Sequence, residues 1–257
     1  MSFITDFFTV IIYQPLFNLL IEIYNIIPDL GVSIVIITVL IRIALLPVSK
    51  KSIESQKKMQ EIQPEVKKIQ EKYKNDKQKQ GQAIMEFYKK KKVNPAAGCM
   101  PLIIQLVILI ALYRVFLAVM DFNGSSELLY SFVENPGQLK EMAFFGLINI
   151  TERSIPLAVV ASGFQFWQSK MMMQKMTKNK PAKKDQKNKN GEPNFGEIMQ
   201  QQMLYMGPIL TFIIGITFPA GLPLYWLITT IFMIGQQYYI MHKENKTDEK
   251  PAAEAKG

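Results

Sequence analysis

Two long apolar segments constrain the fold of this chain more than any other feature. Residues 30–49 and 99–120 each contain one charged side chain, Arg42 and Arg114 respectively. At a rise of 1.5 Å per residue, a helix of about twenty residues matches the roughly 30 Å hydrocarbon core of a bilayer. The sequence therefore predicts an all-α polytopic membrane protein.

Three further apolar segments follow, at residues 155–169, 203–219 and 222–241. The last two are separated by Pro219, Ala220 and Gly221, which favour a tight reversal of the chain. Five transmembrane helices are expected in total. The segment at 155–169 is short for a full span, which indicates a locally thinned bilayer.

The N-terminal stretch is apolar but carries a polar stripe. Its polar residues recur at spacings of four, four and three, which puts them on one helical face: Gln14, Asn18, Glu22 and Asn25. We expect residues 1–29 to form an amphipathic interfacial helix. A sixth span, with a tight turn at residues 28–30, is the alternative. No basic region precedes the stretch, so a cleavable signal peptide is not expected.

The net charge of +9 is distributed unevenly along the chain. Lysine is concentrated in residues 50–95 and 170–202, whereas residues 1–29 and the loop at 121–154 are net acidic. Because lysine and arginine favour the cytoplasmic side, we expect an outer N-terminus and a cytoplasmic C-terminus. The basic loop 170–202 and the tail 242–257 are predicted to be cytoplasmic, and the stretch from Lys175 and the tail to be disordered.

The first cytoplasmic segment, residues 50–92, has the apolar periodicity of a packed helix. Apolar side chains step by three and four along it: Met59, Ile62, Val66, Ile69 and Tyr73. A second helix, with Phe87 on its apolar side, is expected from about Gln78 to Lys91, giving a helical hairpin. Pro64 should kink or break the first helix. The alternative is a solvated spacer whose lysines only set topology.

Arg42 is the most informative single residue, because a charge at the centre of a span costs about 2.5 to 3.5 kcal/mol on insertion scales. No acidic residue lies within the five predicted spans. We therefore expect a hydrated cavity around Arg42, with snorkelling to the interface as the alternative. Polar residues of the spans provide its candidate walls: Thr38, Gln105, Gln165, Gln168, Thr229, Thr230, Gln236 and Gln237.

The composition argues against catalysis. The chain has one cysteine, Cys99, and one histidine, His242, and the spans carry no acid, base and nucleophile set. We expect neither an enzyme nor a site for a metal or other cofactor. A transporter of small solutes or anions that uses Arg42 is the alternative function, although internal repeats and paired broken helices are lacking.

Four ordered segments carry a family resemblance: IRIALLPVSKKS (41–52), MQEIQPEVKKIQEKYKND (59–76), VNPAAGCMPLIIQ (93–105) and FPAGLPLYW (218–226). With these segments, residues 30–241 resemble the YidC family of membrane protein insertases. The resemblance implies five transmembrane helices, at residues 30–49 and within 93–241, around a hydrophilic groove. This groove opens to the cytoplasm and to lipid.

The resemblance also assigns roles. Arg42, Gln168 and Trp226 match groove positions, and Thr38, Gln105 and Thr229 are the added groove candidates. The apolar helix of a substrate is expected to slide over Trp167, Met171 and Tyr225, and the hairpin to receive substrates. The implied function is that of an insertase and chaperone for small membrane proteins in the bacterial plasma (inner) membrane. The implied partners are nascent membrane proteins, the Sec translocon, ribosomes, the signal-recognition pathway and the phospholipid bilayer. We expect the chain to function as a monomer.

Overall fold

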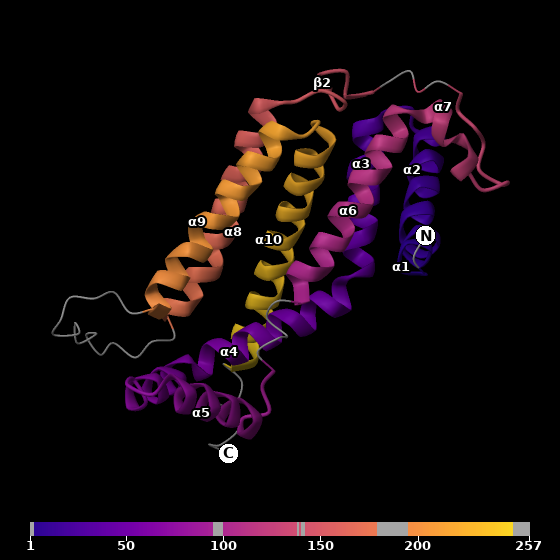
Figure 1. The fold of residues 1–257 in the computed structure, drawn as a ribbon. Coiled ribbons are helices and arrows are strands. Elements are labelled where there is room, and N and C mark those ends of the chain that lie inside the picture. The colour runs from indigo at the N-terminus through magenta and orange to yellow at the C-terminus, as the bar shows by residue number, and fades with distance from the viewer. Residues whose placement is uncertain (1–2, 95–99, 138, 140–141, 179–194, 249–257) are drawn as a thin grey trace, which may run out of the picture.

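The structure, a computed structural model, describes residues 3–94, 100–137, 139, 142–178 and 195–248. Most of these residues are helical, and the longer helices run side by side in a bundle (Figure 1). The first half of the chain contains α1 (Phe3–Phe8), the π-helix η1 (Thr9–Tyr13), α2 (Gln14–Ile26), α3 (Leu30–Ala44), α4 (Leu46–Lys72), α5 (Lys77–Lys90) and α6 (Met100–Met120). The second half contains α7 (Phe122–Ser125), the 3-10 helix η3 (Ser126–Leu128), strands β1 (Ala143–Phe144) and β2 (Ile148–Asn149), α8 (Ile155–Lys178), α9 (Phe195–Thr217) and α10 (Gly221–Asp248).

The bundle has two distinct ends. The helices α4 and α5 extend from one end, here called the hairpin end, and the described residues between 121 and 154 cover the other, the loop end (Figure 1). Helix α10 packs against α8 and α3, α9 packs on α8, and α2 packs on α3 and α6. The core between them is apolar, and its largest fully buried side chains include Phe17, Leu20, Ile34, Ile37, Leu112, Val115 and Tyr225.

The predicted first span is bent rather than straight. Helix α3 ends at Ala44 and α4 leaves it at an angle of 59°. Pro47 accounts for the break, because it has no N–H to donate to the carbonyl oxygen of Ile43, whereas Leu45 N–H still donates to that of Ile41 at 3.0 Å. By contrast, α4 passes through Pro64 without ending, so the break expected there is absent.

Three predicted spans continue as helices beyond their apolar parts. Helices α8 and α9 extend into the predicted loop 170–202, and α10 runs to Asp248 in the predicted disordered tail. The added residues are mostly lysine, glutamine and methionine, which are good helix formers. The predicted disorder of residues 179–194 and 249–257 lies outside the described residues.

The polar stripe of the N-terminal run contacts protein. Gln14 and Asn18 donate to the carbonyl oxygen of Leu128, at 3.1 and 2.9 Å, and Asn25 donates to that of Glu134. The 3%-exposed Asn18 also accepts from Tyr130 N–H at 2.6 Å. The polar face of this helix therefore packs against residues 128–134. An interfacial helix, as expected from the sequence, would direct this face to water and lipid headgroups.

The strand pair at the loop end is fastened to the start of α3. One carboxylate oxygen of Asp29 caps α3 by accepting from Val32 N–H at 2.8 Å, and the other accepts from Phe145 N–H at 2.7 Å. The backbone approach is so close that a Cβ atom on Gly31 would lie 2.4 Å from the Cβ of Phe144. Glycine is therefore required at this contact.

The described helices include two that are long and apolar enough to cross a bilayer, Thr5–Ile26 and Ile103–Met120. A third is counted if the bent pair of Leu30–Ala44 and Leu46–Ser55 forms one span, and Leu204–Thr217 is a shorter apolar helix. The N-terminal helices, Thr5–Ile26, are thus long and apolar enough to form the sixth span that the sequence left as an alternative. Phe8, near the start of this run, contacts Arg114 of α6, and Phe17 stacks on Phe122 of α7 at the loop end.

Candidate functional site

A buried polar cluster joins α3, α6 and α10. The guanidinium of Arg42 donates through Nη2 to Gln105 Oε1 and to Thr229 Oγ1, the latter at 3.3 Å. Gln105 Nε2 in turn donates to the Tyr225 hydroxyl at 2.9 Å. Arg42 is only 8% exposed, and Tyr225 is fully buried. Three helices that are distant in sequence therefore converge on one cation.

Local helix periodicity explains this convergence. Ile34, Thr38 and Arg42 are four residues apart, so one face of α3 carries all three into the bundle. Tyr225 and Thr229 have the same spacing on α10. The Thr38 hydroxyl donates to the carbonyl oxygen of Ile34 at 2.5 Å, so it bonds within its own helix rather than to Arg42.

The charge on Arg42 is held by neutral groups. Its two side-chain partners are an amide oxygen and a hydroxyl, and the guanidinium Nε has no acceptor among the described residues. Burying a cation without a carboxylate is costly, and each neutral hydrogen bond compensates only in part. The cluster is therefore suited to binding an incoming carboxylate or carbonyl oxygen, and it contains no nucleophile paired with a base.

A second polar group lies between α8 and α10. Gln165 Oε1 accepts from Trp226 Nε1 at 3.2 Å and from Thr230 Oγ1 at 3.1 Å. Trp226 is half-buried, and Gln168, one helical turn from Gln165, is buried. The proposed groove residues are thus divided between two sets of contacts: Gln105 and Thr229 bond directly to Arg42, whereas Trp226 bonds to Gln165.

The residues expected on a sliding surface are not equivalent. Trp167 is 54% exposed on α8, beside an apolar cavity of about 320 Å³ lined by Val160, Gly163, Phe164 and Trp167. Met171 is partly exposed. Tyr225 is a correction to the sequence interpretation, since its hydroxyl belongs to the Arg42 cluster and its ring is fully buried. Apolar content alone does not reveal which side of α10 faces the bundle.

The hairpin is built on the expected seam. Ile62 and Val66 are buried, and the other seam residues are partly buried: Met59, Ile69, Tyr73 and Phe87. Lys91 Nζ lies 2.9 Å from Glu65 Oε1, and Gln80 Nε2 donates to the carbonyl oxygen of Gln70 at 2.7 Å, so the two helices are also linked by polar contacts.

Comparison with known proteins identifies the family of this chain. The sequence model of the family described as 60Kd inner membrane protein matches residues 22–248, which include α3 to α10. The chain belongs to the 60Kd inner membrane protein family. This membership and the apolar helices support a location in the bacterial inner membrane.

Curated proteins similar to this chain include several named "Membrane protein insertase YidC". The protein of Janthinobacterium sp. (strain Marseille) is 34% identical over 91% of this chain and 37% of its own length. That of Syntrophus aciditrophicus (strain SB) is 36% identical over 88% of this chain and 36% of its own length. The chain therefore spans about a third of the length of these relatives.

A solved structure shares the fold. It is described as an active YidC insertase crystal structure with the first transmembrane domain resolved. The likeness has a TM-score of 0.55 at 20% sequence identity and covers 93% of this chain and 47% of the other. At this identity the likeness establishes the helical architecture alone.

Proposed function

We propose that this chain is a membrane protein insertase and chaperone that moves small membrane proteins from the cytoplasm into the bilayer. The observation that carries the proposal is the buried Arg42, whose side-chain partners among the described residues are neutral, in a chain whose curated relatives are named insertases. A cation in this state offers a polar segment a transient partner inside the apolar bundle.

Arg42 and its neighbours would hold the polar segment that has to cross. Gln105 and Thr229 are neutral acceptors, so a substrate carboxylate replaces either one with a stronger, charge-assisted hydrogen bond. The guanidinium Nε adds a donor that lacks an acceptor among the described residues. Thr38, Gln168 and Trp226 would form the more distant polar walls of a hydrated groove.

The apolar helix of the substrate would supply the driving force. Transfer of an apolar helix into hydrocarbon is favourable, so insertion requires no nucleotide and no cofactor. The exposed Trp167 and the partly exposed Met171 lie on α8, where an arriving helix would move into lipid. The apolar cavity beside Trp167 would accept a side chain of that helix.

The hairpin would receive substrates on the cytoplasmic side. Its lysine content favours a cytoplasmic hairpin end, with α3, α6, α8, α9 and α10 as the five spans and the C-terminus in the cytoplasm. Nascent chains would arrive from ribosomes, with or without the signal-recognition pathway and the Sec translocon. We propose that a single copy suffices, because the Arg42 cluster is assembled within one chain.

The test is insertion of a one-span substrate that has an acidic translocated tail. We expect Arg42→Gln to slow insertion by roughly 10-fold or more, because a charge-assisted hydrogen bond contributes about 1.5 to 3 kcal/mol. The measurement is protease protection of the tail after reconstitution of the purified protein in vesicles.

Two controls make the result specific. Arg153→Gln removes a positive charge from an exposed position at the loop end and should leave insertion unchanged. A substrate with asparagine in place of the acidic residues should lose its dependence on Arg42. Equal insertion of the acidic substrate by the Arg42→Gln variant and the unaltered protein contradicts the electrostatic role.

A further inference from the structure

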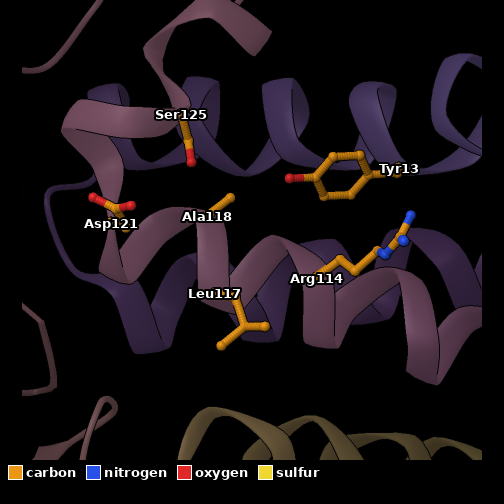
Figure 2. A pocket seen from close by; sticks show the side chains of 6 residues that line it. All are labelled: Tyr13, Arg114, Leu117, Ala118, Asp121 and Ser125. Atoms are coloured by element: carbon orange, nitrogen blue, oxygen red, sulfur yellow. The ribbon is translucent and has the colours of Figure 1, made fainter.

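A cavity at the loop end contains two opposite charges that do not pair with each other. It has a volume of about 320 Å³ between η1 and α6 and is lined by Tyr13, Arg114, Leu117, Ala118, Asp121 and Ser125. Figure 2 shows Arg114 and Asp121 at opposite ends of this group, with the Tyr13 hydroxyl directed between them toward Ser125. On α6 the cavity residues begin nine residues beyond Gln105, the member of the Arg42 cluster on the same helix.

Arg114 interrupts an exposed apolar stripe on α6. The large apolar side chains exposed on this helix include Leu106, Ile110 and Leu117, which lie three or four residues from one another or from Arg114. The guanidinium lies 5.6 Å from the centre of the Phe8 ring, and Arg114 makes no ion pair with a carboxylate of the described residues. A cation among lipid-facing apolar side chains is stabilised by an anion at the same depth in the membrane.

Asp121 supplies the opposite charge nearer the end of the helix. It occupies the N-cap position of α7, yet its side chain makes no capping hydrogen bond. Seven residues separate it from Arg114, which corresponds to two helical turns or about 10.5 Å of rise. The exposed carboxylate therefore lies closer to the aqueous phase than the guanidinium does.

We propose that this cavity binds the headgroup of a phospholipid that carries both a phosphate and a primary ammonium group, as phosphatidylethanolamine does. The phosphate would bind Arg114, and the ammonium would bind Asp121. The Tyr13 and Ser125 hydroxyls, between the two charges, would donate to phosphate oxygens, and an acyl chain would lie along Leu106 and Ile110.

The direction of the charges decides in favour of this lipid. Along the lipid molecule the acyl chains, the phosphate and the ammonium follow in that order, and along the chain Leu106 and Ile110, Arg114 and Asp121 follow in the same order. An anionic headgroup without an ammonium would satisfy Arg114 but would be repelled by Asp121. Charge complementarity therefore selects the zwitterionic headgroup.

Native mass spectrometry of the purified full chain, with added phosphatidylethanolamine or phosphatidylglycerol, tests the assignment. We expect preferential retention of phosphatidylethanolamine. Arg114→Gln should reduce retention of both lipids by roughly tenfold, since it removes a charge-assisted contact with the phosphate. Asp121→Asn should reduce retention of phosphatidylethanolamine alone and so abolish the preference.

Matched controls are available at the same end of the bundle. Arg153→Gln and Glu127→Gln make equivalent charge changes at exposed residues that do not line the cavity, and retention should be unaffected. Equal phosphatidylethanolamine retention by Arg114→Gln and Arg153→Gln overturns the assignment, as does preferential retention of phosphatidylglycerol by the unaltered chain. If Arg114→Gln does not fold, the lipid preference of Asp121→Asn decides alone.

Discussion

At the scale of single residues, Gln105 has a central position in the Arg42 cluster. Its amide accepts from Arg42 and donates to the Tyr225 hydroxyl, so one side chain connects a buried cation on α3 to α10. An amide is well suited to this position, because it provides a donor and an acceptor at once. Leucine at position 105 would fill a similar volume and provide neither.

Gln105→Leu should therefore destabilise the bundle. It removes one hydrogen-bond partner from Arg42 and one from Tyr225, and loss of a partner inside the core costs about 1 to 3 kcal/mol. Thermal unfolding in detergent micelles measures the effect, and Gln82→Leu, at an exposed site on α5, is the control. A decrease in stability no greater than that of the control would mean that the cluster contributes nothing to folding.

The sequence identified Arg42 because a charge in an apolar span is conspicuous. It also selected Gln105 and Thr229, since polar residues in spans are few. It did not place Tyr225 in the cluster, because the rotation of α10 about its axis is set by packing and not by its apolar composition. The sequence likewise did not predict the hydrogen bonds that Gln165 accepts from Trp226 and Thr230.

At the scale of elements, the turn of the hairpin depends on a helix cap. Lys79 N–H donates to the Asp76 carboxylate at 3.0 Å, and this bond, together with the Lys79 ammonium 3.3 Å away, holds the pKa of Asp76 below its ordinary value. A carboxylate whose pKa is lower in the folded state stabilises that state above its unfolded pKa. This contribution is lost as the pH falls through the folded pKa.

The first turn of α5 should therefore become less protected as the pH falls below the ordinary range of an aspartate, whereas Asp76→Ala should show the weaker protection at every pH. Hydrogen exchange of the backbone amides of residues 77–80, compared between the two proteins at each pH, measures the difference. Equal protection at neutral pH would show that the cap does not hold the turn. Residues 46–49, at the other end of the hairpin, are the internal reference.

The N-terminal run shows why an amphipathic pattern does not define an environment. Gln14, Asn18 and Asn25 share a face, as the spacing predicted, but their partners are backbone carbonyl groups of residues 128–134. Those partners lie more than a hundred residues away in sequence, so no local pattern indicates them. The bend at Leu45, in contrast, has a local cause in Pro47, which the apolar count of residues 30–49 had overlooked.

At the scale of the whole molecule, the distribution of charge implies an orientation. The hairpin end carries most of the lysine, whereas residues 1–29 are net acidic. This distribution favours an outer N-terminus.

Labelling of single cysteines tests this orientation. With Cys99 replaced by serine, Asp6→Cys should react with a membrane-impermeant thiol reagent in intact cells, and Gln82→Cys, in the hairpin, should react only after lysis. Both positions are exposed in the structure. Protection of Asp6→Cys in intact cells, with labelling after lysis, would instead indicate that Thr5–Ile26 crosses the membrane.

Because of the bend at Leu45, the hairpin projects from the bundle as a long arm. The 27 residues of α4 form an arm roughly 40 Å long that begins beside the final turn of α3. A tilt of about 10° at the bend would carry the far end of this arm through about 7 Å, whereas Arg42, three residues before Leu45, would keep its place. The far end of the hairpin would thus sample a wide volume of cytoplasm, while Arg42 stays fixed inside the bundle.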